Sequence, residues 1–231
     1  MFEVNNQNDV FDALKSKQFS FTNNSYLENI QPSYRRGINN QRKILDDNNL
    51  NENFIFNFRH PESGSIVYDS HALSNYRPLI KNNFKDLVKG KLKKALNFLH
   101  PYKYAEKDWL EWNFEQFKRS NFGYSNYYEP ILDIGNPLIL SSPSGFKWNL
   151  RWIRYLYFRE RLFSVFTKDL IDISSIIDLG GCYGGFISLL AKSLPNKSYT
   201  LLDLGENIPL AAYYIVKVLK GFKINVVNSK S

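Results

Sequence analysis

The sequence predicts a mixed α/β protein, in which a mainly helical N-terminal region precedes a unit of alternating parallel strands and helices. Three observations support this prediction. A β-branched run ends in a glycine cluster at 180–185, an apolar helical segment follows it, and a second apolar strand ends in Asp203. Strands that alternate with helices are typical of a doubly wound sheet. We place the boundary between residues 168 and 169, which gives the segments 1–168 and 169–231.

The first fifty or so residues alternate short apolar patches with Asn, Gln and Ser, and they show no long helical period. The run Asp46–Asn49 predicts a loop. Beyond it, Phe54, Phe56 and Phe58 occupy alternate positions. This spacing predicts a short strand with three aromatic side chains on one face.

Helical periodicity begins further along the chain. Leu79–Leu99 combines an apolar stripe with many lysines, which favours an amphipathic helix with a solvated lysine face over a phosphate-binding helix. We predict further helices over Lys107–Ser120 and Trp148–Phe166, separated by an irregular segment or hairpin at Asn126–Gly145. Ile131–Gly135 imitates a strand that ends in an acidic-glycine turn, but Asn136-Pro137 follows it. We therefore exclude it as a cofactor loop.

Composition sets broad limits on function. The net charge of +8 favours phosphate-bearing partners, although a basic surface without a dedicated partner explains it equally well. Cys182 is the single cysteine, so the chain has no intramolecular disulfide, and a reducing compartment is the simpler expectation. No signal peptide is recognised, and the apolar stretch Ile208–Leu219 is too short to span a bilayer. We expect a cytoplasmic protein without a membrane span.

The glycine cluster carries the clearest chemical signal. The predicted strand Ser175–Leu179 leads into Gly180–Gly185, and an apolar helix then runs as far as Pro195. Glycine allows a sharp turn at the strand end and leaves room for a ligand to approach the backbone. The helix start then offers unpaired N–H groups to a polar ligand.

A second strand, Tyr199–Leu202, ends in Asp203, which lies 23 positions after Gly180. This interval suits an acidic residue that accepts hydrogen bonds from both hydroxyls of a ribose. A helix over Leu210–Leu219 and a third strand at Ile224–Val227 complete the predicted order β-α-β-α-β. We expect the turn and the Asp203 carboxylate to face one another across the ends of neighbouring parallel strands.

The segment from Asp178 to Gly184 resembles motif I of class I methyltransferases, an acidic residue followed by spaced glycines. Dinucleotide enzymes differ, because their G-x-G-x-x-G turn holds a pyrophosphate. The resemblance implies a Rossmann-like sheet and S-adenosylmethionine as the cofactor. It assigns cofactor binding to Asp178, Gly180, Gly181, Cys182, Tyr183, Gly184, Asp203 and Leu204. A nucleophilic role for Cys182 is the weaker alternative, and the Tyr183 ring either lies near the cofactor or shields the loop from solvent.

The segment Leu201–Asn207 is similar to the one that follows the second strand in bacterial sugar O-methyltransferases. The lead-in from Glu129 to Gly145 resembles the same group, and the likeness extends to about Leu219. The sequence departs from that pattern in two places, with Cys182 in place of glycine and Gly205 in place of proline. The resemblance implies methyl transfer to a sugar hydroxyl of a polysaccharide or glycolipid.

A full sheet of that family continues beyond three parallel strands, so we expect a truncated chain that is inactive alone and prone to aggregate at its open edge. No catalytic residue is predicted, because the general base would lie beyond Ser231. The histidines show no metal-ligand spacing, and we predict no metal site. Two alternatives stay open, an RNA methyltransferase, although nucleic acid is the less favoured partner, and a non-catalytic half-domain that binds or assembles. The oligomeric state is left open.

Overall fold

A computed structural model describes residues 1–47, 52–60, 63–67, 134–137, 139–141, 147–166 and 169–227. The helices predicted over Leu79–Leu99 and Lys107–Ser120 lie outside these residues. The described part is a mixed α/β structure with three two-stranded sheets, one of which is parallel.

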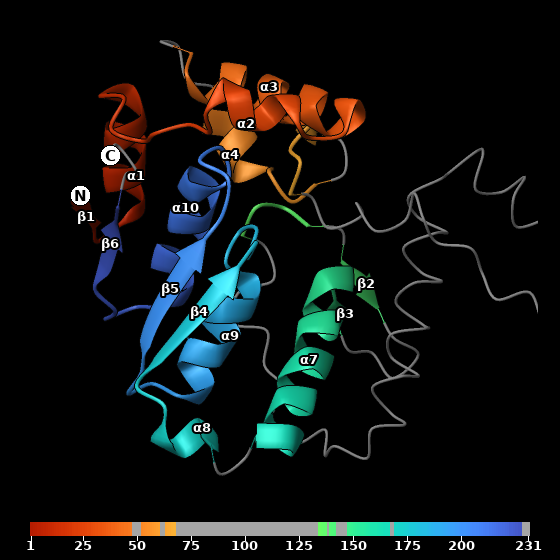
Figure 1. Cartoon of the computed structure of the whole chain (residues 1–231), viewed down its shortest axis with the longest axis vertical. Coiled ribbons are helices and arrows are strands. Elements are labelled where there is room, and N and C mark those ends of the chain that lie inside the picture. Colours follow the sequence, from red (N-terminus) through yellow and green to blue (C-terminus); the bar gives the residue numbers. More distant parts are fainter. Residues whose placement is uncertain are drawn as a thin grey trace, which may run out of the picture.

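The parallel sheet consists of β4 (Ser175–Leu179) and β5 (Ser198–Leu202), in register from Ser175 opposite Ser198 to Leu179 opposite Leu202. Helix α9 (Gly185–Ser193) connects the two strands, and α10 (Ile208–Val218) follows β5. Both helices lie on the same face of the sheet (Figure 1). Alternate strand residues point away from them, and Ile177, Leu179 and Leu202 are exposed on the opposite face. The predicted order strand, glycine turn, helix, strand, helix is confirmed.

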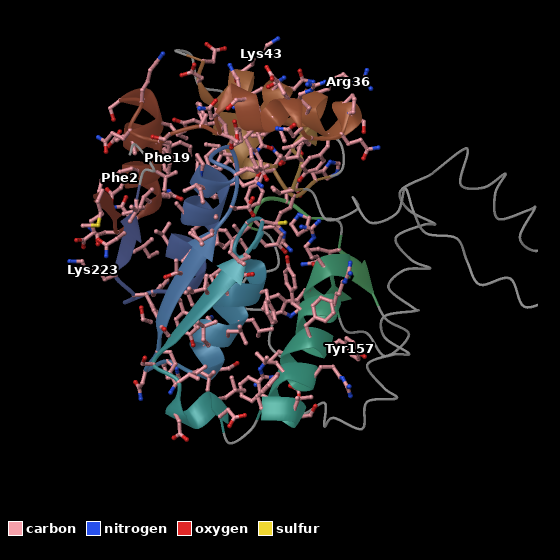
Figure 2. The ribbon with its side chains drawn as sticks, viewed as in Figure 1. Phe2, Phe19, Arg36, Lys43, Tyr157 and Lys223 are labelled. Atoms are coloured by element: carbon pink, nitrogen blue, oxygen red, sulfur yellow. The ribbon has the colours of Figure 1, made fainter. Side chains whose placement is uncertain are left out.

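The prediction of a third parallel strand is wrong. Strand β6 (Ile224–Val226) forms where expected, but it pairs antiparallel with β1 (Phe2–Val4). An ion pair of 3.0 Å between Lys223 Nζ and Glu3 Oε2 and an edge-to-face contact between Phe2 and Phe19 flank this pair (Figure 2). The β6 pattern specifies a strand but not its partner, and the partner here lies more than 200 residues earlier.

The N-terminal residues form four helices: α1 (Gln7–Lys15), α2 (Asn24–Glu28), α3 (Pro32–Leu45) and α4 (Glu52–Phe56). The sequence showed no long helical period over its first fifty residues, but α3 is a long helix in this region, so that interpretation is wrong. Asp46 and Asp47 of the predicted loop follow the end of α3, and Asn48 and Asn49 lie outside the described residues. Two asparagines of this region cap helices. Asn6 forms a capping box with Asp9, and the Asn23 side chain accepts a hydrogen bond from the backbone of Ser25.

The strand predicted from the alternating phenylalanines is also wrong, because α4 includes Phe54 and Phe56 and a turn follows at residues 57–59. Ile55 is fully buried together with Phe54 and Phe58, whereas Phe56 is partly exposed. A strand would place Ile55 and Phe54 on opposite faces, so the burial of both fits a helix that packs on two sides. The alternation of phenylalanines was too short to distinguish the two structures.

The predicted helix before the glycine turn is confirmed as α7 (Leu150–Phe166) and is followed by the short helix α8 (Asp169–Asp172). Of the segment Asn126–Gly145, predicted to be irregular or a hairpin, the described part includes β2 (Leu140–Ser141), whose antiparallel partner β3 (Lys147–Trp148) lies just beyond that range. Within the described ranges, no helix has both the length and the apolar character needed to cross a membrane.

One hydrophobic core joins the N-terminal helices to the α/β unit. Its members come from both regions, including Val10, Phe11 and Ile38 from the first and Tyr213 and Tyr214 from the second. The strand arrows of β4 and β5 both point toward the N-terminal helices (Figure 1). The N-terminal region therefore lies beside the carboxyl ends of the parallel strands, where ligands bind in open α/β sheets.

Candidate functional site

The glycine turn begins where β4 ends. The Gly180 N–H donates to the Leu202 carbonyl across the sheet at 2.8 Å, and the Gly184 N–H donates to the Gly181 carbonyl at 2.9 Å. Gly180 and Gly184 have φ values of 72° and 80°, which glycine adopts without steric cost. Cys182 lies in the same left-handed region with φ 53°, which is uncommon for a residue with a side chain. The turn therefore holds the backbone in a shape that most sequences avoid.

Gly181 is required by close packing rather than by its backbone angles. A Cβ at this position would lie 2.6 Å from Asp178 Oδ2 and 2.9 Å from the Leu201 side chain. A Cβ built at Gly180, in contrast, meets nothing within 4 Å. The turn is therefore packed against the strands on one side and open at Gly180.

The Asp203 carboxylate lies directly opposite the turn. Its Oδ2 accepts the backbone N–H of Cys182 at 2.6 Å. Its Oδ1 accepts the Leu204 N–H and the Asn207 Nδ2 group, each at 2.7 Å. The expected juxtaposition of the turn and this carboxylate across the ends of two parallel strands is confirmed, and the contact is a direct hydrogen bond. Burial raises the pKa of Asp203, while the hydrogen bonds from Asn207, Leu204 and Cys182 oppose that shift.

Asp178 provides a second carboxylate beneath the turn. Its Oδ2 atom is buried and accepts no hydrogen bond from the residues that the structure describes. Burial, and to a lesser degree the nearby Asp203, raises the pKa of Asp178. A buried carboxylate oxygen without a donor costs free energy. This oxygen lies on the packed side of the turn, beneath Gly181.

Two of the predicted cofactor-binding residues point their side chains elsewhere. The Tyr183 ring is fully buried and packs against Phe58 and Tyr214 at centroid distances of 5.8 and 4.9 Å. Arg59 lies over the same ring at 4.8 Å. Leu204 packs against the core with a partly buried side chain, and its backbone N–H contacts Asp203. The main chain of Tyr183 belongs to the turn, whereas its ring is buried in the core, with the Arg151 guanidinium 5.9 Å from the ring centroid.

Two residues that the sequence did not indicate as site residues surround Cys182. The Arg151 guanidinium, at the start of α7, lies 5.9 Å from the Tyr183 ring centroid, and its positive charge acts on the Cys182 thiol. Tyr34 of α3 is close enough to Cys182, Asp203 and Arg151 for their charges to affect its pKa. Burial raises the pKa of the Cys182 thiol, and Arg151 opposes that shift. Burial likewise raises the pKa of Tyr34. Neither residue belongs to a motif, and only the fold brings them to the turn.

The loop from Asp203 to Asn207 is fixed by the N-terminal region. Arg42 pairs with Glu206 Oε1 through Nε at 2.8 Å, and the Glu206 side chain is fully buried. Thr22 Oγ1 donates to Glu206 Oε2 at 2.6 Å and accepts the Gly205 N–H at 3.0 Å. The backbone of the N-terminal region approaches this loop so closely that only glycine fits at position 205, because a Cβ there would lie 2.1 Å from the Ser20 carbonyl oxygen.

Two cavities lie apart from this site. Cavities of about 590 and 640 Å³ lie beside α4 and beside α10, and neither includes a residue of the glycine turn. Within the described residues, no group of three or more His, Cys, Asp or Glu side chains could hold a metal ion. The chemistry that the described residues offer therefore centres on the turn, its two carboxylates and Arg151.

The site can accommodate a ligand that donates hydrogen bonds to two carboxylates and approaches a glycine backbone closely. It supplies acceptors at Asp178 and Asp203, backbone N–H groups at the start of α9, which has no side-chain cap, and positive charge at Arg151. Comparison with protein-family models, curated proteins and solved structures gives no match for this chain.

Proposed function

We propose that this chain binds S-adenosylmethionine at the glycine turn and belongs to a Rossmann-like O-methyltransferase that acts on a sugar hydroxyl. The observation that carries the proposal is the hydrogen bond from the Cys182 N–H to Asp203. It ties the turn after the first parallel strand to an acidic residue at the end of the second. This pairing is the hallmark of nucleoside binding in doubly wound sheets.

The residues present fit this cofactor. Asp203 lies where it can receive the ribose hydroxyls, and the open side of Gly180 leaves room for the ligand to pass over the backbone. Asp178 lies directly beneath the turn, where the positive charge of the cofactor ammonium group would favour its ionised form. Arg151 adds positive charge for the carboxylate of the same amino-acid part. When bound, S-adenosylmethionine supplies an electrophilic methyl group on a sulfonium.

The acceptor is proposed from the resemblance of Leu201–Asn207 and of the lead-in to sugar O-methyltransferases. Methyl transfer to a hydroxyl is an in-line displacement that needs alignment and a base for the hydroxyl proton. The described residues around the turn position the donor, and we assign none of them as the base. The sugar of a polysaccharide or glycolipid is therefore the substrate class of the proposal.

An RNA substrate is less well supported. The RNA alternative rests on the net charge of +8 and on the arginine-rich segment 151–161. Three arginines of α7, Arg151, Arg154 and Arg159, contact other residues of the protein, whereas Arg161 is exposed. The Arg151 guanidinium lies 5.9 Å from the Tyr183 ring centroid, and Arg159 contacts Ser193 and Glu160 at 2.8 and 2.7 Å. An RNA-binding surface needs such side chains to reach phosphates.

The test is isothermal titration calorimetry with S-adenosylhomocysteine on the wild type and on two matched glycine variants. Gly180→Ala and Gly221→Ala carry the same strain, since both glycines have positive φ and open space around the added Cβ. Only Gly180 lies in the turn. We expect Gly180→Ala to weaken binding at least tenfold, about 1.4 kcal/mol, and Gly221→Ala to bind like the wild type.

Two results would count against the proposal. The first is no heat of binding from a wild-type protein whose circular dichroism shows the expected helices. The second is equal loss of affinity in both glycine variants, because the effect would then come from general destabilisation. Steeply salt-dependent binding of RNA with no binding of S-adenosylhomocysteine would favour the RNA alternative.

A further inference from the structure

We infer that Gln41 and Asn207 are positioning residues that orient the Asp203 carboxylate toward the glycine turn through a relay of side-chain amides. The relay begins at the backbone of Ile66 and ends at the N–H of Cys182. This inference rests on the proposed function, because it assigns those two residues a role in forming the cofactor site. Their place in the relay, however, follows from hydrogen-bond chemistry alone.

The orientation of the Gln41 amide is fixed at its oxygen end. Gln41 Oε1 accepts the Ile66 N–H at 3.0 Å and the Ser65 hydroxyl at 3.1 Å. A backbone N–H can only donate, so the group that faces it must be the amide oxygen. The Gln41 side chain is fully buried. If its amide were reversed, the NH2 group would face the Ile66 N–H, and these donors would have no acceptor, which costs free energy.

The Gln41 nitrogen then fixes the next amide. Gln41 Nε2 donates to the Glu206 carbonyl at 2.7 Å and to Asn207 Oδ1 at 3.1 Å. A carbonyl can only accept, so the nitrogen assignment is determined at this end too. Because the Asn207 oxygen faces Gln41, its nitrogen must point the other way. It donates to Asp203 Oδ1 at 2.7 Å.

The relay determines how Asp203 presents its two oxygens. Oδ1 receives the Asn207 and Leu204 donors, which leaves Oδ2 turned toward the Cys182 N–H. All three neighbours donate, so their hydrogen bonds stabilise the ionised carboxylate, the form that can accept hydrogen bonds from a ribose, and they oppose the rise in the Asp203 pKa that burial causes. Gln41 belongs to α3 and Ile66 to the segment 63–67. The N-terminal region therefore sets the geometry of a site formed by the α/β unit.

The test replaces the Asn207 amide, which donates to Asp203, with a carboxylate of the same shape, which can only accept when ionised. Asn207→Asp places a second carboxylate against Asp203, and the two then compete for one proton. We expect its affinity for S-adenosylhomocysteine to fall at least tenfold at pH 8 and to recover as the pH is lowered toward 5, where a shared proton restores the donor. The wild type should show no such recovery. Asn196→Asp, an exposed residue with the same charge change, is the control.

A second measurement does not need the ligand. Hydrogen exchange of the Cys182 amide, followed by NMR at equal pH, reports whether Asp203 still accepts that N–H. We expect exchange at least tenfold faster in Asn207→Asp than in Asn196→Asp. If Asn207→Asp does not fold, Gln41→Met serves instead, because it removes both the amide oxygen and the amide nitrogen of Gln41. Exchange of the Cys182 amide should again be faster than in the control.

The outcomes separate the relay from the proposed function. Faster Cys182 exchange in the variant, together with a wild type that never binds S-adenosylhomocysteine, would refute the cofactor and support the relay. Wild-type binding with an Asn207→Asp variant that keeps the same pH profile and the same Cys182 protection would overturn the relay.

Discussion

At the scale of single residues, the site combines a hydrogen-bonded carboxylate with one that lacks a donor. Asp203 is surrounded by three donors, whereas Asp178 Oδ2 is buried and receives none from the described residues. Burial raises the pKa of both groups. Asp178 thus lowers the stability of the fold at neutral pH, which the ligand contact proposed above would explain.

This view predicts that Asp178→Asn stabilises the free protein at neutral pH. A carboxyl whose pKa is raised by folding favours the folded state below its unfolded pKa, and this contribution is lost as the pH rises through the folded value. At pH 7 the free energy of unfolding of the variant should therefore exceed that of the wild type by about 1 kcal/mol, and its melting temperature should be higher. The difference should vanish below about pH 4.

Thermal melts followed by circular dichroism across this pH range measure the effect. Asp172→Asn, an exposed residue on α8, is the matched control and should leave the melting temperature unchanged. A lower melting temperature for Asp178→Asn at pH 7 would mean that the carboxylate is satisfied in solution.

At the scale of the elements, the loop between β5 and α10 is where the N-terminal region docks. Gly205 permits this contact, since a Cβ there would lie 2.1 Å from the Ser20 carbonyl oxygen and 2.8 Å from the Phe21 Cα. Both are backbone atoms that cannot rotate away. We expect Gly205→Ala to cost about 1–3 kcal/mol, measured as a lower midpoint in urea.

Gly221→Ala is again the comparison, because its Cβ meets no atom within 4 Å and it tests backbone strain alone. A Gly205→Ala protein no less stable than Gly221→Ala would show that the 18–22 segment does not dock on this loop in solution.

The sequence predicted those elements whose signals are local. The run Ser175–Leu179, the glycines after it and Asp203 at the end of the next strand are each determined within a few residues, and they lie where expected. The pairing of β6 with β1 was not predictable, because an edge strand carries no mark of its partner. The contribution of α3 to the site was hidden for the same reason. Gln41 and Tyr34 sit in a polar, Asn-rich segment, and only tertiary packing brings them to the turn.

At the scale of the whole molecule, one core unites the N-terminal helices with the α/β unit. Phe11 of α1 is buried and contacts the rings of Tyr213 on α10 and Phe56 on α4, at centroid distances of 5.9 and 5.8 Å. The Arg42–Glu206 ion pair and the amide relay cross the same boundary. When one of two regions that share a core unfolds, the other loses its core contacts and its buried polar contacts as well. The two regions should therefore unfold as one cooperative unit.

The single cysteine makes this cooperativity measurable, because Cys182 belongs to the glycine turn of the α/β unit and not to the N-terminal helices. We expect Phe11→Ala to destabilise the protein by about 3–5 kcal/mol and to lower the urea midpoint for thiol labelling of Cys182 as much as the midpoint for loss of helix. Phe166→Ala, at an exposed position of α7, should move neither. If Cys182 in the Phe11→Ala protein stayed protected at urea concentrations that had already melted the N-terminal helices, the two regions would unfold independently. The relay from Ile66 to Asp203 would then be unable to couple them.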